Sequence, residues 1–371
     1  MTAGSETRGA AAGTTQAGTM PLMTARAREG WPDVVKGVCI ILVVMWHVVV
    51  KHSSDLPWED AGGVPEMWTV VSAQLLPLRM PLFFVVSGMF AASAVLAPTR
   101  ARLTTRALRL ALLYLLWVVI QTFALAAAGP DFDTARATDA WSLLLQLTIS
   151  PTNLWYLLAL ALYLIVGRVT RGIPTAVLLP LGFLVSAVAA AGMLPDSGNL
   201  WQVVQNVVFF LAGLRLPELV RRFAARASWA TAAGLGALYV ASLVVVSLLG
   251  ARQWFGVWTL LSALAVVAGI SACALIDRWE PLAAPLRWIG RRTLPIYVIH
   301  MIPLALLDRM LRGVEPWVYR GPVLAVIEPL LITALVIAAS LGAHALLRRM
   351  RAEVLFDPLL LGRFGGRAAR L

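Results

Sequence analysis

The stretch VVKGVCIILVVMWHVVVK, residues 34–51, decides the fold class of this chain. Apart from Lys36, His47 and Lys51, it holds no acidic or basic side chain. An apolar run of about 20 residues is long enough to cross the hydrocarbon core of a bilayer as an α-helix. The stretch therefore predicts a transmembrane helix that carries two basic groups into the membrane.

Apolar runs of this kind recur along the whole chain of 371 residues, of which 60% are hydrophobic and 13% charged. A soluble globular chain carries about 25% charged residues, so lipid is the natural solvent here. We predict an all-α polytopic membrane protein of about ten transmembrane helices, at 34–51, 72–97, 107–128, 153–167, 174–194, 200–217, 229–250, 254–276, 288–311 and 322–347. Residues 141–149 are apolar but too short to cross.

The distribution of arginines along the chain predicts its orientation in the membrane and the limits of the membrane domain. The Arg-rich loops alternate with loops that are poorer in Arg and richer in acid; they are 98–106, 168–172, 215–228 and 277–292. The positive-inside rule therefore predicts that both termini of this multi-pass chain are cytoplasmic. The preference for Arg over Lys, with abundant Ala, Val and Leu, indicates a bacterial genome, so we expect a plasma (inner) membrane. We expect residues 1–30 to be a disordered cytoplasmic tail, 31–347 the membrane domain and 348–371 a basic cytoplasmic tail.

The formal net charge is +12, which in a soluble protein would suggest nucleic acid. In a membrane chain it indicates arginines that anchor loops to lipid headgroups, so we expect membrane lipids and no nucleic acid as partners. Cys39 and Cys273 fall inside apolar runs and are expected to be buried thiols. No HExxH motif or clustered His/Cys set is present in the sequence, and we expect no metal.

Ionisable groups inside a span are costly and are candidates for function. Lys36 and His47 are eleven residues apart, which places them on one helix face about 16 Å apart. The face between them includes Ile40 and Val43 and would line a path through the membrane. The alternatives are that Lys36 extends to the inner headgroups and that His47 packs against a neighbouring helix.

Arg79 precedes Pro81 in the second run, where the proline removes a backbone donor and perturbs the helix. The arginine would either bind a phosphate or carboxylate or fill the freed carbonyls. Ser87-Gly88 follows and favours close helix packing over a nucleophile, because no GxSxG motif surrounds it.

Other polar side chains recur in later spans. Gln202, Gln205 and Asn206 are spaced for one helix face, and Tyr297 and His300 are three residues apart and so adjacent on a helix. Taken singly, each is explained as a contact between helices.

Together these segments resemble the acyltransferase 3 family of bacterial membrane acyltransferases, which includes O-acetylases of cell-envelope polysaccharides. The first span resembles the family's basic residue followed by ten residues and a histidine, with Lys36 where many members have Arg. The other matching segments are Met80 to Gly88 (MPLFFVVSG), Leu154 to Leu157 (LWYL), Val208 to Leu214 (VFFLAGL) and Gly290 to His300 (GRRTLPIYVIH). In the last segment Thr293 replaces the family's Ser, and in the LWYL segment Tyr156 replaces its Phe.

The resemblance implies a cytoplasmic acyl-CoA donor, with acetyl the commonest acyl group, and an acceptor hydroxyl on a cell-envelope carbohydrate, glycolipid or secreted metabolite. It implies that His47 is catalytic, as general base or acyl carrier, and we expect no bound cofactor. Lys36 or Arg79 would orient the donor or stabilise the oxyanion. The expected acyl-CoA or substrate contacts are Arg102, Arg106, Arg109, Trp155, Tyr156, Asn206, Arg291, Arg292, Tyr297 and His300. Some members continue into a soluble hydrolase-like domain, so this chain would act without one or with an extracytoplasmic partner protein.

A transporter or flippase of a lipid-linked or small anionic substrate is the main alternative, since charged groups in broken helices suit it equally. The sequence shows no internal repeat, and the ordered motif set favours the enzyme. A scaffold would not need several ionisable groups in its spans, and a glycosyltransferase that acts on lipid-linked sugars is a further alternative.

Overall fold

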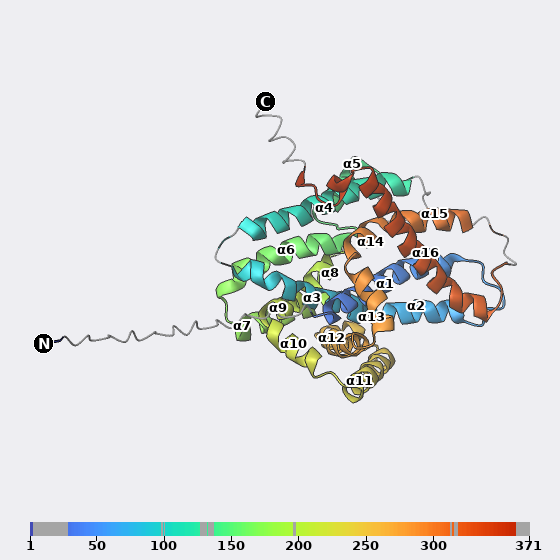
Figure 1. The fold of residues 1–371 in the computed structure, drawn as a ribbon. Helices are drawn as coiled ribbons and strands as arrows, with labels where there is room; N and C mark the ends of the chain where they lie inside the picture. Colours follow the sequence, from blue (N-terminus) through green and yellow to red (C-terminus); the bar gives the residue numbers. More distant parts are fainter. Residues whose placement is uncertain are drawn as a thin grey trace, which may run out of the picture.

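A computed structural model describes residues 1–2, 29–97, 99, 101–126, 132, 137–195, 198–311, 314 and 318–360. The expected N-terminal tail lies almost wholly outside these residues, as does the C-terminal tail beyond 360. Throughout the described part the chain forms helices and no strand (Figure 1). The α-helices are α1 (Trp31–Lys51), α2 (Val64–Gln74), α3 (Leu76–Leu96), α4 (Ala101–Ala126), α5 (Ala140–Thr148), α6 (Trp155–Val169), α7 (Thr175–Ala190), α8 (Leu200–Gln205), α9 (Val207–Arg215), α10 (Pro217–Ala225), α11 (Trp229–Leu248), α12 (Val257–Ile276), α13 (Glu280–Gly290), α14 (Thr293–Ile299), α15 (Met301–Leu311) and α16 (Pro322–Arg349).

Six helical stretches in the described chain are long and apolar enough to cross a membrane: Trp31–Asp55, Val64–Leu96, Ala101–Ala126, Trp229–Leu248, Val257–Ile276 and Pro322–Arg349. Two bent pairs, Leu200–Arg215 with Pro217–Ala225 and Thr293–Ile299 with Met301–Leu311, raise the count to as many as eight. The expected count of ten is not confirmed. The helices α6 and α7 have 15 and 16 residues, fewer than the roughly 20 that a crossing requires.

Helix α1 lies inside the bundle, in contact with α3, α12, α13, α14 and α16. It begins with Pro at its first turn, which suits a helix start because those N–H groups have no partner within the helix. By contrast α11 lies at the periphery beside α12, and Tyr239 is its one buried residue (Figure 1). Its other apolar side chains are free to face lipid.

Helices α3 and α9 meet backbone to backbone. A Cβ atom added to Gly88 would lie 2.2 Å from the carbonyl oxygen of Phe210, and one added to Gly213 would lie 2.0 Å from that of Val85. Glycine is therefore required at both positions, as expected where small residues let membrane helices approach closely. The close approach predicted at Ser87-Gly88 is confirmed.

The Arg-rich loops gather at one end of the bundle. Arg168 donates to the carbonyls of Val95 and Ala97, Arg215 donates to that of Arg171, and Arg221 pairs with Glu29. Within the last loop Arg287 pairs with Asp277. The neighbouring Glu280 carboxylate raises the pKa of Arg287. A common end is what the positive-inside rule requires, although which side of a membrane this end faces remains a prediction. Cys39 and Cys273 are buried free thiols, as expected.

A pair of histidines between a polar and an apolar cavity

His47 lies on α1, in the half of the helix far from the Arg-rich end, and lines a polar chamber of about 490 Å³. Its Nδ1 atom is 2.9 Å from the carbonyl oxygen of Val43, one turn earlier on the same helix. A carbonyl oxygen accepts and does not donate, so Nδ1 carries the hydrogen. The Nε2 atom is then the basic nitrogen of the ring, free of that backbone contact.

His300 supports this arrangement from another part of the chain. It occupies the break between α14 and α15, where the helix bends by 47°. Pro303 explains the break, since it has no N–H to donate to the carbonyl of Ile299 and its ring crowds that turn. The sequence contained this signal, but Tyr297 and His300 were expected on one unbroken helix.

The two imidazoles form a directed pair. His300 Nδ1 is 2.8 Å from the carbonyl oxygen of Tyr297, which again requires a hydrogen on Nδ1. The Nε2 atom of His300 is thus an acceptor, and it lies 3.3 Å from His47 Nδ1. Both hydrogens therefore point away from the chamber, and His300 holds His47 in the tautomer that leaves Nε2 basic. Among the described residues no carboxylate contacts either ring.

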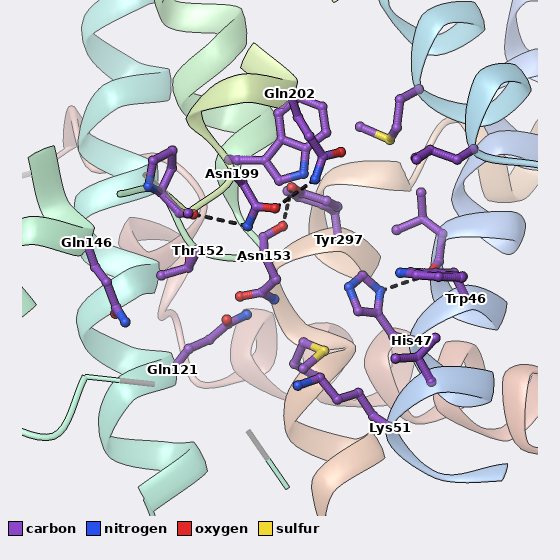
Figure 2. Close-up of a pocket in the computed structure, with 18 of the residues that line it drawn as sticks. Trp46, His47, Lys51, Gln121, Gln146, Thr152, Asn153, Asn199, Gln202 and Tyr297 are labelled. Atoms are coloured by element: carbon purple, nitrogen blue, oxygen red, sulfur yellow. Dashed lines mark hydrogen bonds between the residues drawn. The ribbon is translucent and has the colours of Figure 1, made fainter. Parts of the chain in front are cut away.

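Amides, hydroxyls and indoles line the chamber together with apolar side chains (Figure 2). Besides His47, its uncharged polar and aromatic residues are Trp46, Gln121, Thr122, Gln146, Ser150, Thr152, Asn153, Trp155, Asn199, Trp201, Gln202 and Tyr297. Three cations, Lys51, Arg79 and Arg252, also line it. Gln121 donates its amide nitrogen to the carbonyl of Val298, and Gln202 donates its own to Asn199 Oδ1. Each amide oxygen is then turned to accept hydrogen bonds.

Part of the chamber wall is non-helical backbone between α5 and α6. Tyr297 holds this segment: its hydroxyl donates to the carbonyl of Asn153 at 2.7 Å and accepts from the N–H of Tyr156 at 3.2 Å. Irregular backbone at membrane depth is tolerated where it borders a cavity. Pro151 lies within this segment. The fourth span was expected to begin at 153, and helix α6 begins at Trp155.

A second, apolar cavity of about 180 Å³ lies on the other side of Tyr297. It is lined by Ile40, Val43, Met80, Phe83, Leu110, Tyr156, Leu157, Leu160, Thr293, Leu294 and Tyr297. Three residues, Val43, Met80 and Tyr297, line both cavities. The face of α1 between Lys36 and His47 thus borders this cavity through Ile40 and Val43, as expected from their spacing.

Lys36 and Arg106 meet at Phe90, toward the Arg-rich end of the same helices. The Lys36 ammonium lies 5.2 Å from the centre of the Phe90 ring and 2.5 Å from Asp33 Oδ1. Arg106 donates to the Phe90 carbonyl at 3.3 Å. One turn before Phe90, Ser87 Oγ lies 2.7 Å from the hydroxyl of Tyr156, which lines the apolar cavity. Two cations thus lie beyond the apolar cavity on the side of the Arg-rich end.

Arg79 lines the polar chamber yet is 3% exposed. Its guanidinium stacks over Trp46 at 4.7 Å and donates to the carbonyl of Ser72. Pro81 lies within the continuous helix α3, so the break predicted beside Arg79 falls instead at Leu75, between α2 and α3. The side chain satisfies a backbone carbonyl, as the second interpretation expected, but it is that of Ser72 and not the Pro77 carbonyl that Pro81 leaves without a donor.

The structure brings Trp155 into the polar chamber, Tyr156 into the apolar cavity and Tyr297 into both, but it leaves other expected contacts outside. Arg109 donates to the Phe356 carbonyl and lies 3.5 Å from Asp357. Arg292 stacks on Trp288 at 4.2 Å. The remaining three expected contacts that line neither cavity are Arg102 and Arg291, both exposed, and Asn206, buried at the α8–α9 junction.

Several chamber residues carried no signal of their own in the sequence. Gln121, Gln146, Asn199 and Arg252 come from separate helices and loops. From sequence alone, an isolated amide in a span predicts a contact between helices, and an isolated arginine in a loop predicts a contact with lipid headgroups. Only the tertiary fold shows that they face one space.

A buried ionic cluster lies beyond α1. The His52 ring is fully buried, with Nδ1 2.8 Å from Asp308 Oδ1 and Nε2 3.1 Å from Glu328 Oε1. Ser53 donates to Glu328 Oε2 at 2.6 Å. Burial, with these two carboxylates, raises the pKa of the nearby Tyr319 hydroxyl. The cluster joins the ends of α1, α15 and α16.

Comparison with known proteins agrees with the sequence motifs. The model of the acyltransferase 3 family, described as "Acyltransferase domain", matches residues 29–348. The inner membrane protein YcfT of Escherichia coli (strain K12) is 24% identical over 373 residues, covering 90% of this chain and 97% of that protein. No solved structure was found to match the chain.

Proposed function

The chain belongs to the acyltransferase 3 family of membrane proteins, and from that membership and its two cavities we propose an O-acyltransferase of the inner membrane. The donor is cytoplasmic acyl-CoA, with acetyl as the first choice. The acceptor is a hydroxyl of a cell-envelope carbohydrate, glycolipid or secreted metabolite on the opposite side. The observation that carries the proposal is the position of His47, in the polar chamber beside the residues that separate it from the apolar cavity.

The donor approaches from the Arg-rich end. Its phosphates suit Lys36 and Arg106, and the thiol end of its narrow pantetheine arm, with the acyl group, suits the apolar cavity lined by Ile40, Phe83 and Leu160. Lys36 lies about 16 Å along the helix from His47, so it cannot reach a carbonyl that reacts there. We therefore assign Lys36 to the distal part of the donor.

The acceptor occupies the polar chamber. Amide oxygens such as those of Gln121 and Gln202 accept from hydroxyl groups, and the indoles of Trp46, Trp155 and Trp201 offer flat apolar faces. This combination suits a sugar, which presents many hydroxyls around an apolar ring face.

In the transfer step, His47 Nε2 takes the proton of the acceptor hydroxyl while the oxygen of that hydroxyl attacks the thioester carbonyl carbon. The carbon–sulfur bond then breaks, and the proton passes from His47 to the leaving thiolate, giving free CoA and an ester. His300 accepts from His47 Nδ1–H and steadies the imidazolium that forms between these steps. Arg79, on the chamber wall, supports the negative charge that develops on the carbonyl oxygen.

The test is release of free CoA from acetyl-CoA by protein purified in nanodiscs, for wild type, His47→Gln and His344→Gln. His344 is a matched control because it packs against Phe356, away from both cavities. We expect His47→Gln to lose about 10²–10⁴-fold in kcat, the range for a general base, and His344→Gln to match wild type.

Release that is unchanged in His47→Gln would contradict the proposed role of His47. If acetyl-, propionyl- and succinyl-CoA neither bind nor release CoA, the acyltransferase proposal fails and the transporter alternative gains weight.

A further inference from the structure

The chamber that we assign to the acceptor is electrostatically one-sided. Its described lining includes the cations Lys51, Arg79 and Arg252 and no carboxylate. Amides and indoles alone would serve a neutral sugar, so the cations require a separate explanation.

Arg79 donates to the Ser72 carbonyl, stacks over Trp46 and already has a place in the proposed transfer step, whereas Arg252 has none. Arg252 belongs to the short helix η3 (Ala251–Gln253) and its guanidinium stacks over Trp258 at 4.6 Å. Stacking fixes the plane of the guanidinium and leaves its N–H edge available for bidentate contact. No carboxylate of the described residues forms an ion pair with it.

Arg320, at the same end of the bundle, does form an ion pair. Its Nη2 atom lies 2.6 Å from Glu59 Oε2 on the surface. The two arginines thus differ in that a described carboxylate pairs with Arg320 and none pairs with Arg252.

Two further donors share the chamber with Arg252. Lys51 lies one turn after His47 on α1 and reaches into the chamber (Figure 2). Asn153 Nδ2 is buried and has no hydrogen-bond partner among the described residues, although its residue lines the chamber. Lysine, arginine and an amide N–H₂ are all donors, and together they fit a group that only accepts, such as a carboxylate or phosphate.

Resting on the proposed function, we propose that the acceptor is an anionic hydroxyl compound, whose carboxylate or phosphate binds at Arg252 while a hydroxyl lies at His47. The charged group can belong to an acidic sugar or to the phosphate of a lipid-linked glycan. In either case it fixes which hydroxyl reaches the histidine.

The experiment compares binding of three oligosaccharides of equal length to protein in nanodiscs without donor: a neutral glucose oligomer, a glucuronic acid oligomer and a phosphorylated glucose oligomer. We expect at least one charged oligomer to bind about tenfold or more tightly than the neutral one, the size of one charge-assisted contact. Arg252→Gln should remove most of that preference and leave the neutral oligomer unchanged. Whichever charged oligomer binds identifies the source of the anion.

Arg320→Gln is the matched control, since it removes the same charge from the same end and should keep the preference. Equal or weaker binding of both charged oligomers, or a preference that Arg252→Gln retains, overturns the inference. Because binding is read without donor, this result is independent of acyl transfer. CoA release from acetyl-CoA by the same preparation reports separately whether the proposed function fails.

Discussion

The Nδ1 atom of His47 lies 3.3 Å from the Nε2 atom of His300, across 253 residues of sequence. Each ring directs its Nδ1 hydrogen to a backbone carbonyl, and this fixes the sense of the pair. In the proposed mechanism, His300 takes the place that a carboxylate has in a serine hydrolase, because it contacts the second nitrogen of the base. The arrangement leads to a first prediction about His300.

Changing His300 to Ala should lower kcat for acyl transfer and leave KM for acetyl-CoA unchanged. The lost contact to a charged imidazolium corresponds to about 1.5–3 kcal/mol, or roughly 10- to 100-fold in kcat. His300→Ala added to His47→Gln should cost nothing further, because the two residues act as one unit. Steady-state kinetics of both single variants and the double variant provide the check. Additive losses, or a raised KM, would show that His300 does not act through His47.

Changing Tyr297 to Phe should loosen the non-helical segment before α6. The variant loses the hydrogen bond to the Asn153 carbonyl and the one from Tyr156 N–H, at about 1 kcal/mol each. Tyr319→Phe is a matched control, because its hydroxyl donates to the Leu311 carbonyl and its side chain lines neither cavity. Both variants should lower Tm by a few degrees, but only Tyr297→Phe should reduce kcat. Equal kinetics in the two variants would remove Tyr297 from the site.

Changing Gly213 to Ala should damage the fold. The new Cβ would lie 2.0 Å from the Val85 carbonyl oxygen, and separating α3 from α9 costs about 1–3 kcal/mol or more. Gly234→Ala on α11 is the control, since its Cβ meets nothing within 4 Å. Alanine also favours a helix over glycine by about 0.5–1 kcal/mol. Thermal unfolding in detergent should therefore show a large drop for Gly213→Ala and none for Gly234→Ala; similar Tm values would contradict the close approach.

Changing Leu160 to Phe should narrow the apolar cavity. We expect KM for acetyl-CoA to rise about tenfold, as a bulkier side chain competes with the donor for the same volume. Leu162→Phe lies on the same helix but is 38% exposed and outside the cavity, so it should match wild type. Unchanged donor affinity in Leu160→Phe would exclude this cavity as the donor passage.

Changing His52 to Leu should destabilise the protein at neutral pH. The variant leaves Asp308 and Glu328 buried near one another without the imidazolium. Removing one partner of a buried ion pair lowers the free energy of unfolding by about 3–5 kcal/mol. Protonation of the carboxylates at acid pH removes their charge, so the difference in Tm from wild type should shrink as the pH falls. A difference that does not change with pH would mean that packing, and not charge, stabilises the cluster.

Local patterns in the sequence predicted much of the fold, but only part of the site. The apolar run around Lys36 and His47 is long enough to define its own helix, and Gly88 indicated close packing within one motif. The His47–His300 contact, by contrast, depends on where Pro303 bends a distant helix. Arg252 and Gln121 face the chamber because of helix packing, which leaves no periodic trace in the residues themselves.

The two cavities draw on different parts of the architecture. The apolar one is built from side chains of α1, α3, α4, α6 and α14, whereas much of the polar chamber comes from helix ends and connecting segments near Ser150, Gly198 and Arg252. With only Val43, Met80 and Tyr297 shared among the described residues, substitutions in the connecting segments can reshape one wall while the other stays intact. Under the proposed assignment of the cavities, substitutions in the connecting segments would change the acceptor in evolution while the donor cavity stays the same.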